Sequence, residues 1–96
     1  MLREGRRVRA RFLDVKRLES ALGYLRVGVV VPKYGFTAVR RNTLKRRLRE
    51  LARQRLLTLA DSCDLVIRAR REAYEASFAS LRDDIESVAP RVTPRA

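Results

Sequence analysis

The sequence predicts a single small α+β domain, residues 1–96, with helices packed on one face of a small sheet. Three observations support this fold class. The chain has 96 residues, 46% of them hydrophobic, which suffices for one modest core. Three short segments are alternating or β-branched, as strands are. Two longer segments repeat their apolar residues every three or four positions, as amphipathic helices do. Their order is β-β-α-β-α.

The first two predicted strands precede the longer helix. Residues 6–15 alternate basic with apolar side chains, Arg7, Arg9 and Arg11 against Val8, Ala10 and Phe12. Residues 16–23 are polar and end in glycine, which predicts a hairpin loop. Residues 24–31 are rich in valine, typical of a strand buried on both faces. Pro32 cannot donate a ladder hydrogen bond, so this strand ends there.

The first helix is predicted over residues 38–59, with Thr37 as its N-cap. One side is an apolar stripe of Leu44, Leu48, Leu51, Ala52 and Leu59. The opposite side carries Asn42, Arg46, Arg49 and Arg53, with Lys45 at the border between the two. At about 1.5 Å per residue, this side is a ridge of hydrogen-bond donors about 15 Å long.

The remaining elements are a strand and a helix. Residues 63–69, with Leu65, Val66 and Ile67 at the centre, predict the third strand. A second helix is predicted over residues 72–89, with an apolar stripe of Tyr74, Phe78, Leu81, Ile85 and Val88. Pro90 should stop it, and residues 90–96 should form a frayed tail.

Charge is the strongest functional signal. The chain has 23 basic and 11 acidic residues, a net charge of +12. Residues 1–60 hold 17 of the basic and 4 of the acidic groups, so the whole excess lies there. Twenty of the cations are arginine, whose planar guanidinium suits phosphate oxygens. A nucleic acid is therefore the expected partner, ahead of acidic proteins or membrane surfaces.

The residues needed for protein-based catalysis are missing or scattered. There is no histidine, and one cysteine, Cys63, forms neither an internal disulfide nor a zinc knuckle. Asp83, Asp84 and Glu86 are expected on the solvated side of the last helix, and Asp61 and Asp64 at turns. We expect no catalytic residue, no metal ligand and no cofactor held by the polypeptide alone. Without a membrane-length apolar run, the expected location is the cytoplasm.

The polar side of the first helix has two interpretations. A solvated surface normally mixes both signs of charge. Between positions 40 and 55 there are eight cations and only one acid, Glu50. Because such cations repel one another in a free helix, a polyanionic partner is the favoured interpretation.

A longer motif runs from the end of the second predicted strand into the first helix. A strand ends in Val-x-Lys, then come Ala-Val and, on the helix, Arg-Asn-x-x-Lys-Arg-x-x-Arg-Glu. The residues are Val31, Lys33, Ala38, Val39, Arg41, Asn42, Lys45, Arg46, Arg49 and Glu50. The stretch from Arg26 to Arg53 closely resembles the ribonuclease P protein family. The later strand and helix follow the family's order, so the resemblance covers nearly the whole chain.

The resemblance implies a fold like the second domain of ribosomal protein S5, with a rare left-handed β-α-β crossover. It implies that ribonuclease P RNA and precursor tRNA are the partners, and that the RNA removes the 5′ leader with bound Mg²⁺. The implied RNA-binding residues are Lys33, Arg40, Arg41, Asn42, Lys45, Arg46, Arg49 and Arg53. A leader cleft on the sheet is implied for Arg9, Arg11, Phe12 and Tyr34, although Phe12 and Tyr34 are equally consistent with core and loop positions. No membrane or DNA partner is expected.

The sequence departs from the family's pattern at three places. Thr43 stands where a third basic residue usually follows the Arg-Asn pair. Tyr34 replaces a lysine, with the loop glycine displaced to Gly35. Family members open with a helix that walls the leader cleft, and residues 2–7 resemble only its last turn. Either translation starts upstream of Met1 or the wall is missing. In the second case, we expect RNA binding with poor discrimination of leaders.

Two other functions stay open. A ribosomal or other RNA-binding protein without a processing role would explain the charge and fold, but not the full motif. A metal-dependent nuclease active without RNA is disfavoured by the missing histidine and scattered carboxylates.

Overall fold

The computed structural model describes residues 7–19, 25–57 and 63–92. Four strands form one sheet in the order β1-β2-β4-β3. They are β1 (Arg7–Arg9), β2 (Leu13–Glu19), β3 (Arg26–Val30) and β4 (Cys63–Ala69). β2 pairs antiparallel with both β1 and β4, whereas β3 pairs parallel with β4. The sheet is therefore mixed, with β1 and β3 at its edges.

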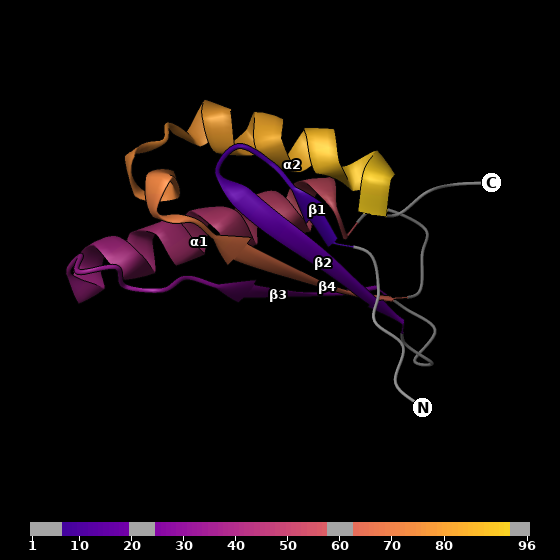
Figure 1. The fold of residues 1–96 in the computed structure, drawn as a ribbon, viewed down its shortest axis with the longest axis horizontal. Helices are drawn as coiled ribbons and strands as arrows, with labels where there is room; N and C mark the ends of the chain where they lie inside the picture. Colours follow the sequence, from indigo (N-terminus) through magenta and orange to yellow (C-terminus); the bar gives the residue numbers. More distant parts are fainter. Residues whose placement is uncertain (1–6, 20–24, 58–62, 93–96) are drawn as a thin grey trace.

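Two α-helices cover one face of the sheet, as predicted (Figure 1). α1 (Ala38–Arg55) packs beside β3, and α2 (Phe78–Val92) packs over β1 and β2. A short 3₁₀ helix, η1 (Arg71–Glu75), leads from β4 to α2. The core lies between the two layers and is dominated by fully buried aliphatic side chains: Leu13, Val15, Leu48, Leu51, Leu65, Ile67, Leu81 and Ile85.

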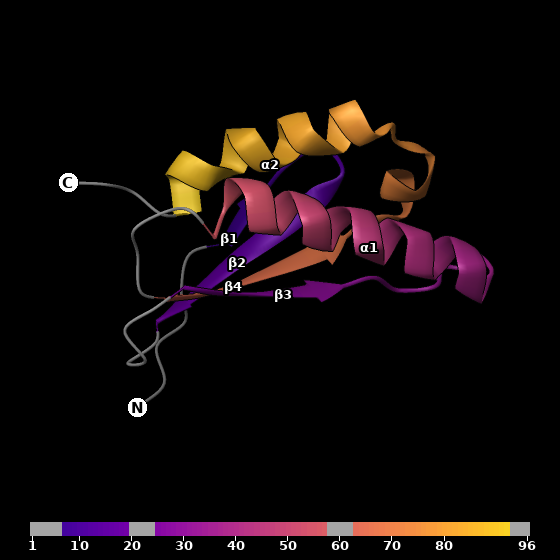
Figure 2. The ribbon, with the colours of Figure 1, turned by 180° about the vertical axis from the view of Figure 1, so that it is seen from behind.

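The β3-α1-β4 connection is left-handed, as the family resemblance implies. In Figure 2, α1 lies in front of the sheet, β3 and β4 both run to the right, and β4 lies above β3. With the strands turned to point upward, the chain steps to the left through a helix in front of the sheet. This is the opposite of the usual right-handed crossover.

The predicted first strand, residues 6–15, is wrong, because the chain reverses direction in the middle of it. Residues 10–12 form a turn closed by a hydrogen bond from the Ala10 amide to the Leu13 carbonyl (2.7 Å). The next strand, β2, runs to Glu19 through much of the predicted 16–23 loop. Residues 20–24 lie outside the described part of the chain. The turn is held by Asp84, which accepts a 2.6 Å hydrogen bond from the Phe12 amide.

The predicted burial of β3 on both faces is also wrong. Val27 and Val29 face the helices and are half-buried, whereas Arg26, Gly28 and Val30 are exposed on the other face. The strand is at the edge of the sheet and has helices on one side only. Its many valines therefore do not indicate full burial.

The first helix begins as predicted and is described to Arg55. The Thr37 side chain accepts a hydrogen bond from the Arg40 amide (3.2 Å), which confirms the N-cap. The predicted stripe is buried at Leu44, Leu48, Leu51 and Ala52. Leu59, predicted as its last member, lies outside the described residues.

The predicted 72–89 helix is two helices, and Pro90 does not stop the second. Tyr74 lies in η1, whereas Phe78 is 40% exposed rather than part of the buried stripe. The first segment ends at Glu75, and Ser77 accepts a hydrogen bond from the Ser80 amide (3.1 Å) just before α2 begins at residue 78. Helix α2 continues to Val92, whose side chain is fully buried.

Other predictions concern the ends of the chain. Arg7, predicted as part of a helical last turn, is the first residue of β1. Residues 2–6 and 93–96 lie outside the described part, although residues 90–92 of the predicted frayed tail belong to α2. Within the described residues, no helix combines the length and apolar composition that crossing a membrane requires.

Candidate nucleic-acid interface

Helix α1 carries the predicted RNA-binding residues on a surface that the rest of the fold leaves open. Asn42, Arg46, Arg49 and Arg53 are all exposed. The first turn contains no acidic residue, although a negative charge there would favour the helix dipole. The helix therefore depends on its buried leucines for stability, and its outer surface is left for charge.

Glu50 neutralises one of these cations. Its carboxylate accepts hydrogen bonds from Arg53 (2.6 Å) and Gln54 (2.7 Å). The hydrogen bond from Arg53 holds the pKa of Glu50 below its ordinary value, and the same contact raises the pKa of Arg53. In the described part of the chain, the side chains of Arg46 and Arg49 make no ion pair or hydrogen bond. They are the two cations of this surface with their donors available.

The arginines at the start of α1 are held by the protein itself. Arg41 donates from Nε to the Val31 carbonyl (2.8 Å), which ties the helix to the end of β3. Arg40 lies over the Phe36 ring, 4.6 Å from its centroid, and donates to the Tyr74 carbonyl (3.2 Å). The protein therefore fixes the direction of both guanidinium groups, and RNA binding by Arg40 and Arg41 stays a prediction.

An aromatic cluster shapes the loop between β3 and α1. Phe36 stacks on Tyr74 at 4.1 Å between ring centroids, and Tyr34 meets Tyr74 edge-on at 6.5 Å. The Tyr74 hydroxyl donates to the Pro32 carbonyl (2.6 Å), and burial raises the pKa of this phenol. Tyr34 and Gly35 both have positive φ (51° and 87°), so the loop turns sharply at this pair.

A wide groove runs between this loop and α1. It encloses about 720 Å³ and is lined by Val29, Val30, Val31, Pro32, Lys33, Arg41, Lys45 and Arg68. Three of its four cations were predicted as RNA-binding, and the groove brings them together. Arg68, from β4, was not predicted. The alternation of residues 63–69 could have placed it: Ile67 points into the core, so its neighbour Arg68 points to the other face of the sheet.

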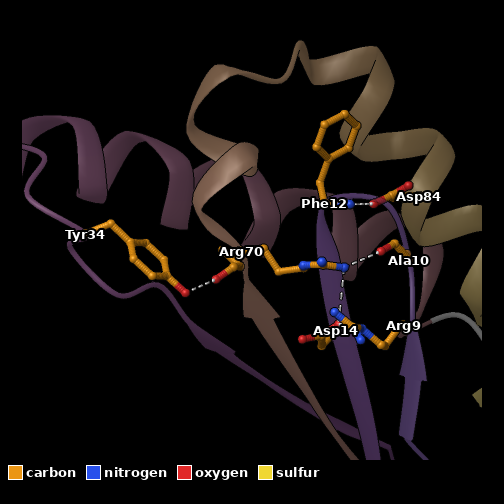
Figure 3. Close-up of polar contacts among 8 residues, drawn as sticks. Arg9, Ala10, Phe12, Asp14, Tyr34, Arg70 and Asp84 are labelled. Carbon is orange, nitrogen blue, oxygen red and sulfur yellow. Dashed lines mark hydrogen bonds and ion pairs between the residues drawn. The ribbon is translucent and has the colours of Figure 1, made fainter.

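The predicted leader-binding residues do not share one site. Phe12 packs against the core and Arg11 lies over its ring, 5.4 Å from the centroid. The Tyr34 hydroxyl donates to the Ala69 carbonyl at 3.5 Å. Figure 3 shows the rings of Phe12 and Tyr34 apart and pointing in different directions. Phe12 thus lies beside the core and Tyr34 in the loop before α1, and contact of either ring with a leader stays a prediction.

Arg9 lies on the open face of the sheet beside Asp14. Its Nε is 3.8 Å from the Asp14 carboxylate, and Arg70 approaches the same oxygen at 3.9 Å (Figure 3). A second groove of about 300 Å³ begins there, lined by Arg7, Asp14, Val15, Lys16, Val66 and Arg68. Because Arg68 lines both grooves, a basic surface continues from α1 to the open face. Sequence reasoning did not assign Lys16 or Arg68 to this surface.

The carboxylates are dispersed. Within residues 7–19, 25–57 and 63–92, no three acidic or cysteine side chains are grouped so that they could hold a metal ion. The expected solvated position of Asp84 is wrong, because this residue is only 8% exposed and binds the Phe12 amide.

Fold and charge together define a small basic α+β domain whose surface is complementary to a polyanion. The comparisons with known proteins give the family. The sequence profile described as Ribonuclease P matches residues 1–93. The chain belongs to the ribonuclease P protein family.

Named relatives agree with this assignment. The ribonuclease P protein component of Thermus scotoductus is 48% identical over 84 residues, covering 88% of this chain and 49% of that protein. The component from a Nocardioides species is 43% identical over 94 residues, covering 95% of this chain and 80% of that protein. The chain spans about half the length of the Thermus relatives.

Solved structures agree in fold. The ribonuclease P protein from Thermotoga maritima superposes with a TM-score of 0.80 at 26% identity, covering 92% of this chain and 84% of that one. The Staphylococcus aureus protein gives a TM-score of 0.74 at 26% identity, covering 88% of this chain and 77% of that one.

Proposed function

We propose that this chain is the protein subunit of ribonuclease P and binds the catalytic RNA and precursor tRNA. The observation that carries the proposal is the family match over residues 1–93, combined with the exposed arginines of α1. In this proposal the RNA performs the hydrolysis with its own Mg²⁺, the protein supplies no catalytic residue or cofactor, and the complex works in the cytoplasm.

The mechanism is electrostatic. Two RNA molecules held together by tertiary contacts repel each other through their phosphates, and Mg²⁺ screens this repulsion. The side chains of Arg46 and Arg49, together with Lys33, Arg41 and Lys45 in the wide groove, would neutralise phosphates at their junction. Less Mg²⁺ would then be needed, and affinity would fall by about 0.7 to 0.9 log units per log unit of salt for each phosphate contacted.

Cleavage of precursor tRNA by a bacterial ribonuclease P RNA at low Mg²⁺ tests the proposal. We expect the protein to stimulate cleavage strongly at the mature 5′ end, and the protein without RNA to be inactive. Tight, salt-sensitive RNA binding without stimulation would contradict it and favour an RNA-binding protein without a processing role. Cleavage by protein freed of RNA would favour a nuclease in its own right.

Leader binding is a separate part of the proposal. We assign it to the open face of the sheet, around Arg7, Lys16 and Arg68, because this groove is basic and shares Arg68 with the groove at α1. A comparison of affinities for leader-bearing and mature tRNA tests it. Equal affinities in the presence of the catalytic RNA would contradict leader recognition while leaving RNA assembly intact.

A further inference from the structure

A narrow slot lies between the edge strand β3 and the C-terminal half of α1. Its volume is about 230 Å³. The apolar part of its lining consists of Val27, Val29, Ala52 and Leu57, and the charged part of Arg46, Arg49, Glu50 and Arg53. An apolar floor is thus surrounded by arginines.

The slot exists because β3 is the last strand of the sheet. Val27 and Val29 face the helix layer and pack against the core, yet they remain partly exposed because no strand lies beyond them. Above them, α1 contributes the small side chain of Ala52. Leu57, just after α1, is 44% exposed. Apolar surface is therefore left uncovered beside the most basic surface of the molecule.

The charges at the rim favour an anion. Glu50 is committed to Arg53 and Gln54, at 2.6 and 2.7 Å. Arg46 and Arg49 have no such partner among the described residues. The rim therefore offers two available guanidinium groups with no uncommitted acid beside them, so an occupant should combine an apolar body with flanking negative charge.

We propose that the slot receives one unstacked nucleobase of a bound RNA, while Arg46 and Arg49 hold the adjacent phosphates. This inference rests on the proposed function in that the polyanion is RNA. A volume of about 230 Å³ is below the ~300 Å³ at which pockets for drug-sized ligands begin, and suits a single flat ring system. Unstacked bases are the parts of RNA that proteins hold between apolar and guanidinium surfaces.

The surface next to the slot can also hold the RNA that continues from the bound base. The slot shares Val29 with the wide groove that contains Lys33, Arg41 and Lys45. An RNA strand that leaves the slot can therefore continue along β3, with its phosphates in contact with these three cations. A second copy of this chain fits less well at the free β3 edge, because it would bring its own eight α1 cations against these.

The test uses three RNA hairpins with the same stem: fully paired, with one unpaired nucleotide, and with an abasic residue at that position. Binding is measured by fluorescence anisotropy over a range of salt. The wild-type protein should bind the hairpin with the unpaired base about fivefold more tightly than the other two. Leu57→Ala and Val29→Ala should remove this preference without changing the salt slope, because they remove no charge.

Two further variants separate the slot from general charge. Phe78→Ala removes a comparably exposed apolar side chain from α2 and should keep the preference. Arg49→Ala should weaken binding to all three hairpins and flatten the salt slope by about one contact. Leu57 lies outside the helices and is 44% exposed, so Leu57→Ala remains informative if Val29→Ala proves unstable.

Three outcomes would overturn the slot. They are equal wild-type affinity for the three hairpins, a preference that survives Leu57→Ala, and a change in sedimentation of the RNA-free protein on Leu57→Ala, which would make the slot a contact between copies. Stimulated cleavage at low Mg²⁺ without base preference would contradict base binding in the slot and leave the proposed function intact. Base preference without stimulation would do the reverse.

Discussion

Helices α1 and α2 lie side by side on one face of the sheet, yet their exposed surfaces differ in charge. Both bury aliphatic side chains: Leu44, Leu48 and Leu51 from α1, and Leu81, Ile85 and Val88 from α2. On its outer side, α1 has eight cations and one acid between positions 40 and 55. The charged residues of α2 are Arg82, Asp83, Asp84, Glu86 and Arg91, a mixture of both signs.

The two helices of this layer use their charged side chains differently. The α2 charges are used within the protein, since Arg82 lies 3.7 Å from Asp83 and Glu86 lies 3.2 Å from Arg55 of α1. Four of the eight α1 cations make no ion pair or hydrogen bond in the described part of the chain: Lys45, Arg46, Arg47 and Arg49. Burial of each helix fixes its place, while the charge outside it determines whether the helix faces solvent or a polyanion.

The largest effects should be equal for the two helices, because both anchor the same core. Leu48→Ala and Ile85→Ala each remove a fully buried side chain. Each should lower the free energy of unfolding by about 2–5 kcal/mol, from lost apolar burial and the cavity left behind. Urea unfolding measures the change. A large loss in one helix and almost none in the other would contradict the equal structural roles.

A smaller loss should distinguish two neighbouring carboxylates of α2. Asp84→Ala leaves the Phe12 amide without its 2.6 Å acceptor and should cost about 2 kcal/mol of unfolding free energy. Asp83→Ala is the matched control, because Asp83 is exposed and pairs only loosely with Arg82. Asp84→Asn keeps an acceptor oxygen and should lose less. Similar losses for Asp83→Ala and Asp84→Ala would show that the β1–β2 turn does not depend on this bond.

Substitutions on the outer sides of α1 and α2 should differ in their effect on RNA affinity, although core substitutions in the two helices have equal effects on stability. Arg49→Ala removes an available guanidinium of α1 and should weaken binding to ribonuclease P RNA about tenfold at low salt, with a salt slope smaller by about one contact. Arg82→Ala, on α2, should leave both affinity and slope almost unchanged. Filter binding at several salt concentrations gives the two quantities. An equal loss for Arg82→Ala would place the RNA across both helices.

The smallest effect concerns the one acid of α1. The Arg53 hydrogen bond lowers the pKa of Glu50, so this contact contributes stability above the unfolded pKa and loses it as pH falls through the lower folded pKa. Arg53→Ala should return the Glu50 pKa toward its ordinary value and reduce this acid dependence. Carboxyl chemical shifts followed by NMR during titration measure it. An unchanged Glu50 titration would mean that the pair is not formed in solution.

Local patterns were sufficient where one segment determines its own structure. The Thr37 cap, the α1 stripe of Leu44 and Leu48, and the bounds of β4 follow from spacing and side-chain chemistry alone. The exposed row of Asn42, Arg46 and Arg49 followed from the same period of 3.6 residues. Charge and motif also sufficed for the family, because they depend on residue identity rather than on contacts.

Long-range contacts decided the rest. The alternation of residues 6–15 continues through the turn at 10–12, and the contacts that hold this turn from outside come from Arg70 and Asp84, 60 and 72 residues away. The valines of β3 predicted a strand buried on both faces, because the sequence does not reveal the order of strands in the sheet. In that order β3 is an edge strand. The same order leaves Val27 and Val29 beside Arg46 and Arg49. The sequence by itself determined the basic helix and the family. Only tertiary structure decided the turn, the edge and the slot, because these depend on residues that are distant in sequence and adjacent in space.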